Sequence, residues 1–327
     1  MKKDKFLILT RSDIEPLIGL KEAIPVVEKA FQDFALGKAS IFPVIREKID
    51  PFGGFFGVKA GYLASQGYLG YKGGGFWKAN PEKGIAGHQS VILLYDPGTG
   101  IPLSAMDGNY LTIIRTGAVG AIAAKYLARS NSKKVGIIGT GTQGRIQLSG
   151  LLEVLQVNEV RTFDLNQEAN QKFADQWKCF RFQIIPCNTA KEAIHGVDVI
   201  VTTTPSFHPI IKDEWVLPGI HINAIGSDTK GKQEIEEKVL GRAKVVVDSL
   251  NQAKELGECQ HAFRNGIIQS IHGELGEIIA QMKPGRETDS EITLFDATGI
   301  ALQDLAVAAY SYEAAVARGV GIYLNLD

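Results

Sequence analysis

The sequence contains little cysteine, no long hydrophobic run and almost no net charge. Its 327 residues include three cysteines, an odd number without metal-ligand spacing, which favours a reducing cytoplasm. The net charge of −1 gives no reason to expect nucleic acid or a membrane surface as a partner. The apolar run Phe6–Leu9 is too short for a signal-peptide core, and no run approaches the length of a membrane span. These features predict a soluble cytoplasmic protein.

The first third of the chain has the pattern of helices and a mostly antiparallel sheet. Ser12-x-x-Glu15 is a predicted capping box, and an amphipathic helix is expected over Lys21–Leu36. The turn sequence Asp96–Gly100 joins two predicted strands into a hairpin. Short strands are expected at residues 44–49, 55–59, 68–72, 90–95 and 101–106. This section therefore predicts a separate α+β domain.

Strands and helices alternate after a predicted alanine-rich helix, Leu111–Ala128. Such alternation indicates βαβ units and a doubly wound parallel sheet. The final helix, about Gly299–Ala317, either completes this sheet or returns to the first domain, and its pattern leaves both possibilities open. The buried strands are expected at residues 134–138, 160–163, 182–185, 197–202, 220–224, 245–247 and 292–295.

A glycine motif follows the first of these strands. Gly139, Gly141 and Gly144 have the spacing G-x-G-x-x-G and open a helix that is expected to run to Leu155. Such a loop lets the backbone approach a pyrophosphate, while the helix N-terminus presents free N–H groups to the phosphates. Asp164 ends the next strand, about 20 residues later, where a carboxylate accepts hydrogen bonds from ribose hydroxyls. No arginine follows it to hold a 2′-phosphate, so NAD is favoured over NADP.

Three further regions are candidates for chemistry. Lys72 lies beside Gly73–Gly75, which reads either as a substrate-facing strand end or as a solvated loop. Arg115 stands in an apolar stretch and therefore needs an anionic partner, either a ligand or a structural carboxylate. The segment 224–232, with Asp228 and Lys232, follows a predicted strand and reads either as a ligand loop or as a polar turn.

The remaining candidates are weaker. Arg46 on a predicted strand and His88 before Ser90 read as a solvated edge residue and a core histidine as readily as substrate ligands. Glu258, Cys259 and His261 have no further residues to complete a metal site, so no metal is expected. The sequence also contains no nucleophile elbow or Ser–His–Asp signature.

Several motifs together resemble the ornithine cyclodeaminase/μ-crystallin family over almost the whole chain. They are Met106–Gly108, Arg115–Ala118, Ala123–Ala128, Gly139–Gly144, His221–Gly226 and Gly231–Glu234. The resemblance implies a homodimer. It also implies a dimerisation and substrate domain formed by residues 1–115 with 305–327, and a Rossmann NAD-binding domain formed by residues 116–304.

The resemblance also implies roles for individual residues around one shared pocket. Arg46, Lys72 and Arg115 would bind a substrate carboxylate, with Lys72 as proton donor or acceptor and Asp228 beside the amino or imino nitrogen. A second carboxylate would need further donors, for which His88, Gln89 and Lys59 are candidates. The cofactor would be lined by Arg115, Thr116, Gly139, Gly141, Thr142, Gln143, Asp164, Leu165, Thr203, Thr204, Ile225, Gly226, Asp228 and Lys232.

The substrate implied is a small 2-imino or 2-oxo acid. The stretches Gly57–Gly61, Leu69–Trp77, Gly87–Ser90, Gly226–Glu234 and Gly257–Ala262 are most similar to iminosuccinate reductases of the family. Alanine dehydrogenases of the family tend to have an arginine near Gly53–Phe55, which this chain lacks. An alanine dehydrogenase, an ornithine cyclodeaminase and a non-enzymatic μ-crystallin-like binding protein remain as alternatives.

Overall fold

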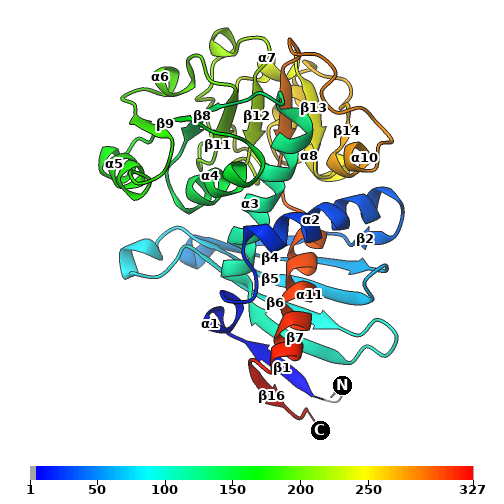
Figure 1. Ribbon diagram of the computed structural model, residues 1–327. Helices are drawn as coiled ribbons and strands as arrows, with labels where there is room; N and C mark the ends of the chain where they lie inside the picture. The colour runs from blue at the N-terminus through cyan, green and yellow to red at the C-terminus, as the bar shows by residue number, and fades with distance from the viewer. Residues whose placement is uncertain (1–4, 327) are drawn as a thin grey trace. The chain divides into compact units, whose positions relative to one another are not determined.

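The chain folds as two units, one of which interrupts the other in sequence (Figure 1). The computed structural model describes residues 5–326. The first unit extends to Arg115 and resumes at Ile300, whereas the second is the continuous segment Thr116–Gly299. The first boundary therefore falls inside helix α3 (Gly108–Leu127), and the second lies just before the last long helix rather than at residue 305. The functional roles assigned to the two domains stay predictions.

The first unit contains an eight-stranded sheet in the order β16-β1-β7-β6-β5-β4-β2, with β3 paired to β4. Neighbouring strands are antiparallel except for β1 and β7, which are parallel. The strands are β1 (Phe6–Leu9), β2 (Ala39–Ile41), β3 (Ile45–Ile49), β4 (Gly54–Leu63), β5 (Tyr68–Trp77), β6 (His88–Tyr95), β7 (Pro102–Asp107) and β16 (Ile322–Leu324). The mostly antiparallel sheet expected for this section is confirmed.

Strand β5 is longer than the sequence predicts, and Lys72 lies near its middle rather than at its end. The three glycines after Lys72 continue the strand, and at two of them the neighbouring strands leave no room for a side chain. A Cβ at Gly74 would come within 2.3 Å of the Gln89 carbonyl oxygen, and one at Gly75 within 1.8 Å of the Phe55 carbonyl oxygen. The interpretation of Gly73–Gly75 as a flexible loop or strand end is therefore wrong.

Helix α11 lies against the sheet of the first unit, where it contacts β4, β5, β6 and α2 (Figure 1). Leu302 and Leu305 of α11 are fully buried, and Gly70 of β5 permits close packing, since a Cβ there would lie 2.9 Å from Leu305. The last helix thus returns to the first unit. The helices of this unit are α1 (Arg11–Ile14), α2 (Leu20–Ala35), the start of α3, α11 (Ala301–Arg318) and the 3-10 turns Asp50–Phe52 and Pro81–Lys83.

The capping box of α1 is displaced from its predicted position. Thr10 is the N-cap, its hydroxyl accepts a hydrogen bond from the Asp13 N–H, and the Asp13 carboxylate accepts one from the Thr10 N–H. The predicted box at Ser12 and Glu15 is therefore wrong by two residues. Thr10 directly follows β1 and has the extended backbone conformation that an N-cap residue requires.

The second unit is built on an eight-stranded parallel sheet in the order β10-β9-β8-β11-β12-β15-β13-β14. Its strands are β8 (Lys134–Ile138), β9 (Glu159–Phe163), β10 (Gln183–Pro186), β11 (Val199–Thr202), β12 (His221–Ala224), β13 (Lys244–Val247), β14 (Gly273–Glu274) and β15 (Thr293–Asp296). Its helices are the rest of α3, α4 (Thr142–Val154), α5 (Gln167–Gln176), α6 (Ala190–Ile194), the 3-10 turn Asp213–Trp215, α7 (Glu237–Leu240), α8 (Leu250–Ala253), α9 (Cys259–Arg264) and α10 (Leu275–Ile279).

The strand order of the parallel sheet reverses between β8 and β11. From β8 the chain proceeds outward through β9 to β10, then returns to β11 on the other side of β8. In such sheets, ligands bind beyond the carboxyl ends of the two strands at this reversal. The predicted fold class, a doubly wound Rossmann sheet with a smaller α+β unit, is confirmed.

Candidate functional site

The glycine loop follows β8 at the reversal of strand order. Gly139 has a φ of +96°, and Gly144 packs so closely that a Cβ would lie 2.2 Å from the Gly139 carbonyl oxygen. Gly141 is the N-cap of α4, and a Cβ there would meet nothing within 4 Å. No side chain caps this helix, so the N–H groups of its first turn, which includes Thr142 and Gln143, point into the loop.

Asp164 is held rigidly at the carboxyl end of β9. Its Oδ2 accepts hydrogen bonds from the Thr140 N–H at 2.8 Å and the Thr140 hydroxyl at 3.1 Å, and its Oδ1 accepts one from the Asn166 N–H at 2.9 Å. Oδ1, which accepts only one of these hydrogen bonds, retains capacity for a further donor. The next side chain, Leu165, is 91% exposed and offers an apolar surface beside the carboxylate.

The loops after β11 and β12 are tied together by Glu234. This buried carboxylate accepts hydrogen bonds from the Thr202 hydroxyl at 2.8 Å, the Thr204 N–H at 2.5 Å and the Gly226 N–H at 2.9 Å. Burial raises the pKa of Glu234 to about 7, although these hydrogen bonds oppose the rise. Thr203 also bridges to the glycine loop, since its hydroxyl donates to the Gly139 carbonyl at 2.8 Å.

Four of the remaining predicted cofactor residues belong to the same unit. Lys232 and Asp228 form an ion pair of 2.7 Å, and the Lys232 ammonium also donates to the Gly226 carbonyl at 3.2 Å. Ile225 is buried at the start of this loop. Thr116 is buried in α3, and its carbonyl accepts a hydrogen bond of 2.6 Å from Gln147 of α4.

A buried charge cluster lies in the first unit, where α11 faces the sheet. One oxygen of Asp304, Oδ1, accepts hydrogen bonds of 2.9 Å from both the Lys72 ammonium and the Arg115 Nε. Lys72 also donates to the Thr112 hydroxyl at 3.1 Å, and Arg115 donates to the Gln303 side-chain oxygen at 2.7 Å. The side chains of the three charged residues are at most 10% exposed.

The strand register places further cations on the same face. Lys59 of β4 is directly opposite Lys72 of β5, so the two side chains share one face of the sheet. Two residues along, Arg46 of β3 is opposite Gly57, which in turn is opposite Gly74. This closely packed pair of glycines lies between the Lys59–Lys72 pair and the aromatic pair Phe55 and Phe76.

Among the residues of this cluster, positive charges outnumber negative ones. Burial alone would raise the pKa of the Asp304 carboxyl, but Arg115 and Lys72 lower it below its ordinary value. Burial lowers the pKa of Lys59 to about 7, and the charges of Lys72, Arg115 and Arg46 act in the same direction, whereas Asp304 opposes them. The cluster therefore has an excess of positive charge.

His88 faces the same side of the sheet as Lys72, opposite Phe76, but it is uncharged at neutral pH. Burial, together with Lys72 and Arg115, lowers the pKa of its imidazole to about 4. Its Nδ1 contacts Asn109 Oδ1 at 3.2 Å, and this oxygen also accepts a hydrogen bond from the Ser90 N–H at 2.9 Å. Nδ1 is therefore the protonated nitrogen, which leaves Nε2 as an acceptor.

Sequence reasoning missed Asp304, Gln303 and Glu234 as site residues. Asp304 is separated from Lys72 by 232 residues, so no local spacing connects them. A usable signal was present nonetheless: an acidic residue stands between Leu302 and Leu305 on the apolar stripe of the last helix. A carboxylate on such a stripe needs a cationic partner.

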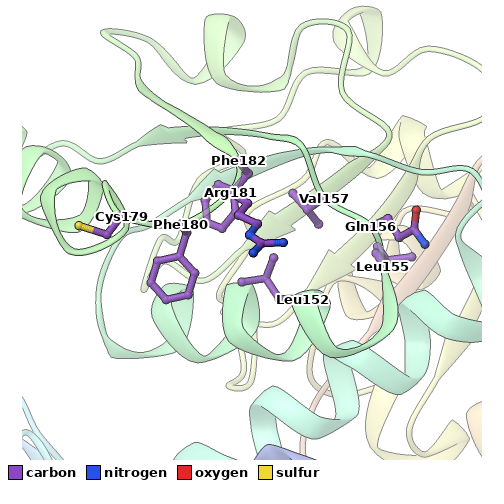
Figure 2. Close-up of a pocket in the computed structure, with 8 residues that line it drawn as sticks. All are labelled: Leu152, Leu155, Gln156, Val157, Cys179, Phe180, Arg181 and Phe182. Atoms are coloured by element: carbon purple, nitrogen blue, oxygen red, sulfur yellow. The ribbon is translucent and has the colours of Figure 1, made fainter.

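Figure 2 shows a pocket of the second unit that is unrelated to these residues. It is lined by the end of α4, including Leu152, and by Val157 and Phe182, which precede β9 and β10. The pocket therefore lies toward the amino ends of the parallel strands, whereas the glycine loop follows a carboxyl end. It lies away from the crevice at the strand reversal.

Two classes of feature are not found among residues 5–326. No group of three or more His, Cys, Asp or Glu side chains is placed to bind a metal ion. No helix in this range combines the length and the apolar character that a membrane crossing needs. The three cysteines are free thiols, of which Cys179 is exposed and the other two are buried.

The sequence profile of the ornithine cyclodeaminase/mu-crystallin family matches residues 4–319. This chain belongs to that family. The resemblance inferred from the motifs is thereby confirmed. An alanine dehydrogenase of Archaeoglobus fulgidus is 44% identical over 96% of this chain and 97% of its own length. An iminosuccinate reductase of Paracoccus denitrificans is 38% identical over 96% of this chain and 98% of its own length.

Solved structures of family members share the complete fold. An archaeal alanine dehydrogenase dimer with bound NAD is 43% identical and superposes with a TM-score of 0.95, over 99% of this chain and 100% of that one. A Δ1-pyrroline-2-carboxylate reductase of Thermococcus litoralis, in complex with NADH and L-proline, is 36% identical. It superposes with a TM-score of 0.94 over 97% of this chain and 100% of its own. The Paracoccus denitrificans iminosuccinate reductase in complex with NAD+ is 37% identical and superposes with a TM-score of 0.93, over 98% of this chain and 100% of its own. These relatives are dehydrogenases and reductases of amino and imino acids.

Proposed function

We propose that this chain is an NAD-dependent reductase of a small 2-imino acid, and that its substrate is iminosuccinate, which becomes L-aspartate. The observation that supports this most is the cationic cluster of the first unit. Lys72 and Arg115 share the carboxylate of Asp304, and Arg46 and Lys59 lie on the same face of the sheet as Lys72. Such a site favours a substrate with more than one negative charge.

The second unit has the groups that a dinucleotide needs. Gly141 and the first turn of α4 present backbone N–H groups to a pyrophosphate, and Asp164 presents a fixed carboxylate to ribose hydroxyls. The negative charge of Asp164 disfavours the 2′-phosphate of NADP. The donors present therefore fit NAD, in keeping with the nucleotides held by the solved relatives.

The residues of the chain contribute to the reaction by binding the charged substrate, orienting it and holding a proton. NADH, when bound, supplies the hydride. Arg46, Lys72 and Arg115 bind the substrate α-carboxylate and fix its orientation. Lys72 holds a proton at Nζ for exchange with the substrate, and Asp304 keeps that ammonium in place through its 2.9 Å contact. Asp228 belongs to the other unit, so its place beside the imino nitrogen stays a prediction.

A substrate comparison tests the proposal. With NADH and ammonium, oxaloacetate is expected to be consumed at least about tenfold faster than pyruvate at equal low concentration, because only the former gives a dicarboxylic imine. NADPH is expected to be a poorer reductant than NADH. Absorbance at the nicotinamide band measures both rates.

The alternatives give different results in the same assay. A preference for pyruvate would identify an alanine dehydrogenase and remove the iminosuccinate assignment. Conversion of ornithine to proline and ammonia without net NADH change would identify a cyclodeaminase. Tight NADH binding without turnover of any 2-oxo acid would indicate a binding protein.

We also propose that the protein is a homodimer formed through the first unit. The face of its sheet opposite α11 exposes Ile45 (57%), Phe56 (42%) and Val91 (46%), which neighbour one another across β3, β4, β5 and β6. An exposed apolar sheet face of this kind favours association. Sedimentation equilibrium is expected to give about twice the 35.4 kDa of one chain, and a mass of one chain would contradict the proposal.

A further inference from the structure

We infer that Lys59 binds the second, distal carboxylate of the substrate and thereby selects dicarboxylic over monocarboxylic 2-imino acids. This inference rests on the proposed function and adds to it the residue that determines substrate class. The argument depends only on residues of the first unit.

The first support is the position of Lys59. It is the direct cross-strand neighbour of Lys72, so the two ammonium-bearing side chains leave the same face of the sheet side by side. The next pair on this face, Gly57 and Gly74, has no side chains, and neither position accepts one. A Cβ at Gly57 would lie 2.7 Å from the Ile45 carbonyl oxygen, and one at Gly74 only 2.3 Å from that of Gln89. The neighbouring strands therefore pack closely at these two positions, and no side chain of this pair separates the two lysines from the next pair on this face, Phe55 and Phe76.

The second support is charge. Asp304 accepts hydrogen bonds from both Lys72 and Arg115 through the same oxygen, so one acid serves two cations. Arg46 adds a further positive charge on this face, and Lys59, whose pKa burial lowers to about 7, adds another when it is protonated. A substrate with one carboxylate leaves a larger excess of positive charge than a substrate with two. The dicarboxylate is therefore the better electrostatic match.

The third support is that His88 and Gln89, the other two candidates for binding the distal carboxylate, are uncharged. His88 is neutral, and its Nδ1 proton is directed to Asn109, which leaves only an acceptor nitrogen that a carboxylate would not approach. Gln89 is uncharged, donates one of its two amide N–H groups to the Ala86 carbonyl at 2.9 Å, and accepts from Asn109 at 3.3 Å through its oxygen. Lys59 is the candidate whose charge suits a carboxylate.

The test compares substrates in Lys59→Met, which keeps an unbranched side chain, one atom shorter, and removes its charge. With NADH and ammonium, kcat/KM for oxaloacetate is expected to fall roughly 100-fold, whereas kcat/KM for pyruvate changes by less than about tenfold. Lys59→Arg, which retains the charge, is expected to keep the preference for oxaloacetate. The exposed Lys38, which precedes β2, provides the matched control Lys38→Met, for which neither value should change.

The outcomes separate the inference from the proposed function. If the wild type prefers oxaloacetate and Lys59→Met keeps the same ratio between the two substrates, the inference is overturned and the function stands. If the wild type prefers pyruvate, both fail. Folding is checked by thermal unfolding, in which Lys59→Met is expected to have a stability close to that of the wild type, because burial and the neighbouring cations already disfavour the charged form of Lys59.

Discussion

Lys72→Ala is expected to abolish turnover, with kcat/KM for oxaloacetate reduced by about three orders of magnitude or more, while NADH binding stays nearly unchanged. Lys72 contacts Asp304 and Thr112 of the first unit, whereas the glycine loop and Asp164 belong to the second. The loss therefore falls on substrate orientation and proton exchange. Steady-state kinetics and a fluorescence titration with NADH measure the two quantities separately.

Lys72→Arg is the matched variant for this experiment. It keeps a positive charge next to Asp304, but the guanidinium does not release a proton at accessible pH. Substrate binding is expected to survive better than turnover, so KM should change less than kcat. A collapse of NADH affinity in Lys72→Ala would instead assign Lys72 to the cofactor site and contradict its proposed role.

Asp304→Asn is expected to destabilise the protein by about 3–5 kcal/mol, because it leaves two buried cations without their shared carboxylate. Activity is expected to fall roughly 100-fold as Lys72 and Arg115 lose their fixed positions. Denaturant unfolding measures the first effect and steady-state kinetics the second. Asp304→Glu, which keeps the charge on a longer side chain, is expected to lose less stability than Asp304→Asn.

The pH dependence of the stability difference between the wild type and Asp304→Asn shows whether charge is its cause. The folded-state pKa of Asp304 is lowered, so its ion pairs contribute stability above the unfolded value of about 4 and lose it as the pH falls through the folded value. The wild type should therefore lose its advantage over Asp304→Asn on acidification below about pH 4. A difference in unfolding free energy that stays constant from pH 7 to pH 3 and below would show that shape, not charge, is responsible.

The second unit was almost fully predictable from the sequence because its determinants are local. The apolar run Val135–Ile138, the spacing of Gly139, Gly141 and Gly144, and an acid at the end of the next strand all lie within about 30 residues. Each feature constrains its neighbours along the chain, so periodicity and spacing carry the information. The observed loop and the hydrogen bonds of Asp164 agree with this prediction.

The first unit was less predictable because its sheet depends on distant partners. Glycine in a strand normally indicates a break, yet Gly73–Gly75 continue β5, and at Gly74 and Gly75 the carbonyls of the neighbouring strands lie too close for a side chain. The return of α11 to this sheet was left open by its apolar stripe. The partner of Arg115 was expected to be an anion, but only the fold identifies it as Asp304.

The segmented order of the first unit has a consequence for biosynthesis. A ribosome completes the strands that carry Arg46, Lys59 and Lys72 early, then the entire second unit, and only afterwards α11, which packs against β4 and β5 and brings Asp304. The segment from Thr116 to Gly299 can fold as it emerges, since its sheet is continuous in sequence. The earliest part of the polypeptide is therefore the last to acquire its finished core, and a nascent chain halted before residue 300 would hold its cationic strands without the helix that neutralises them.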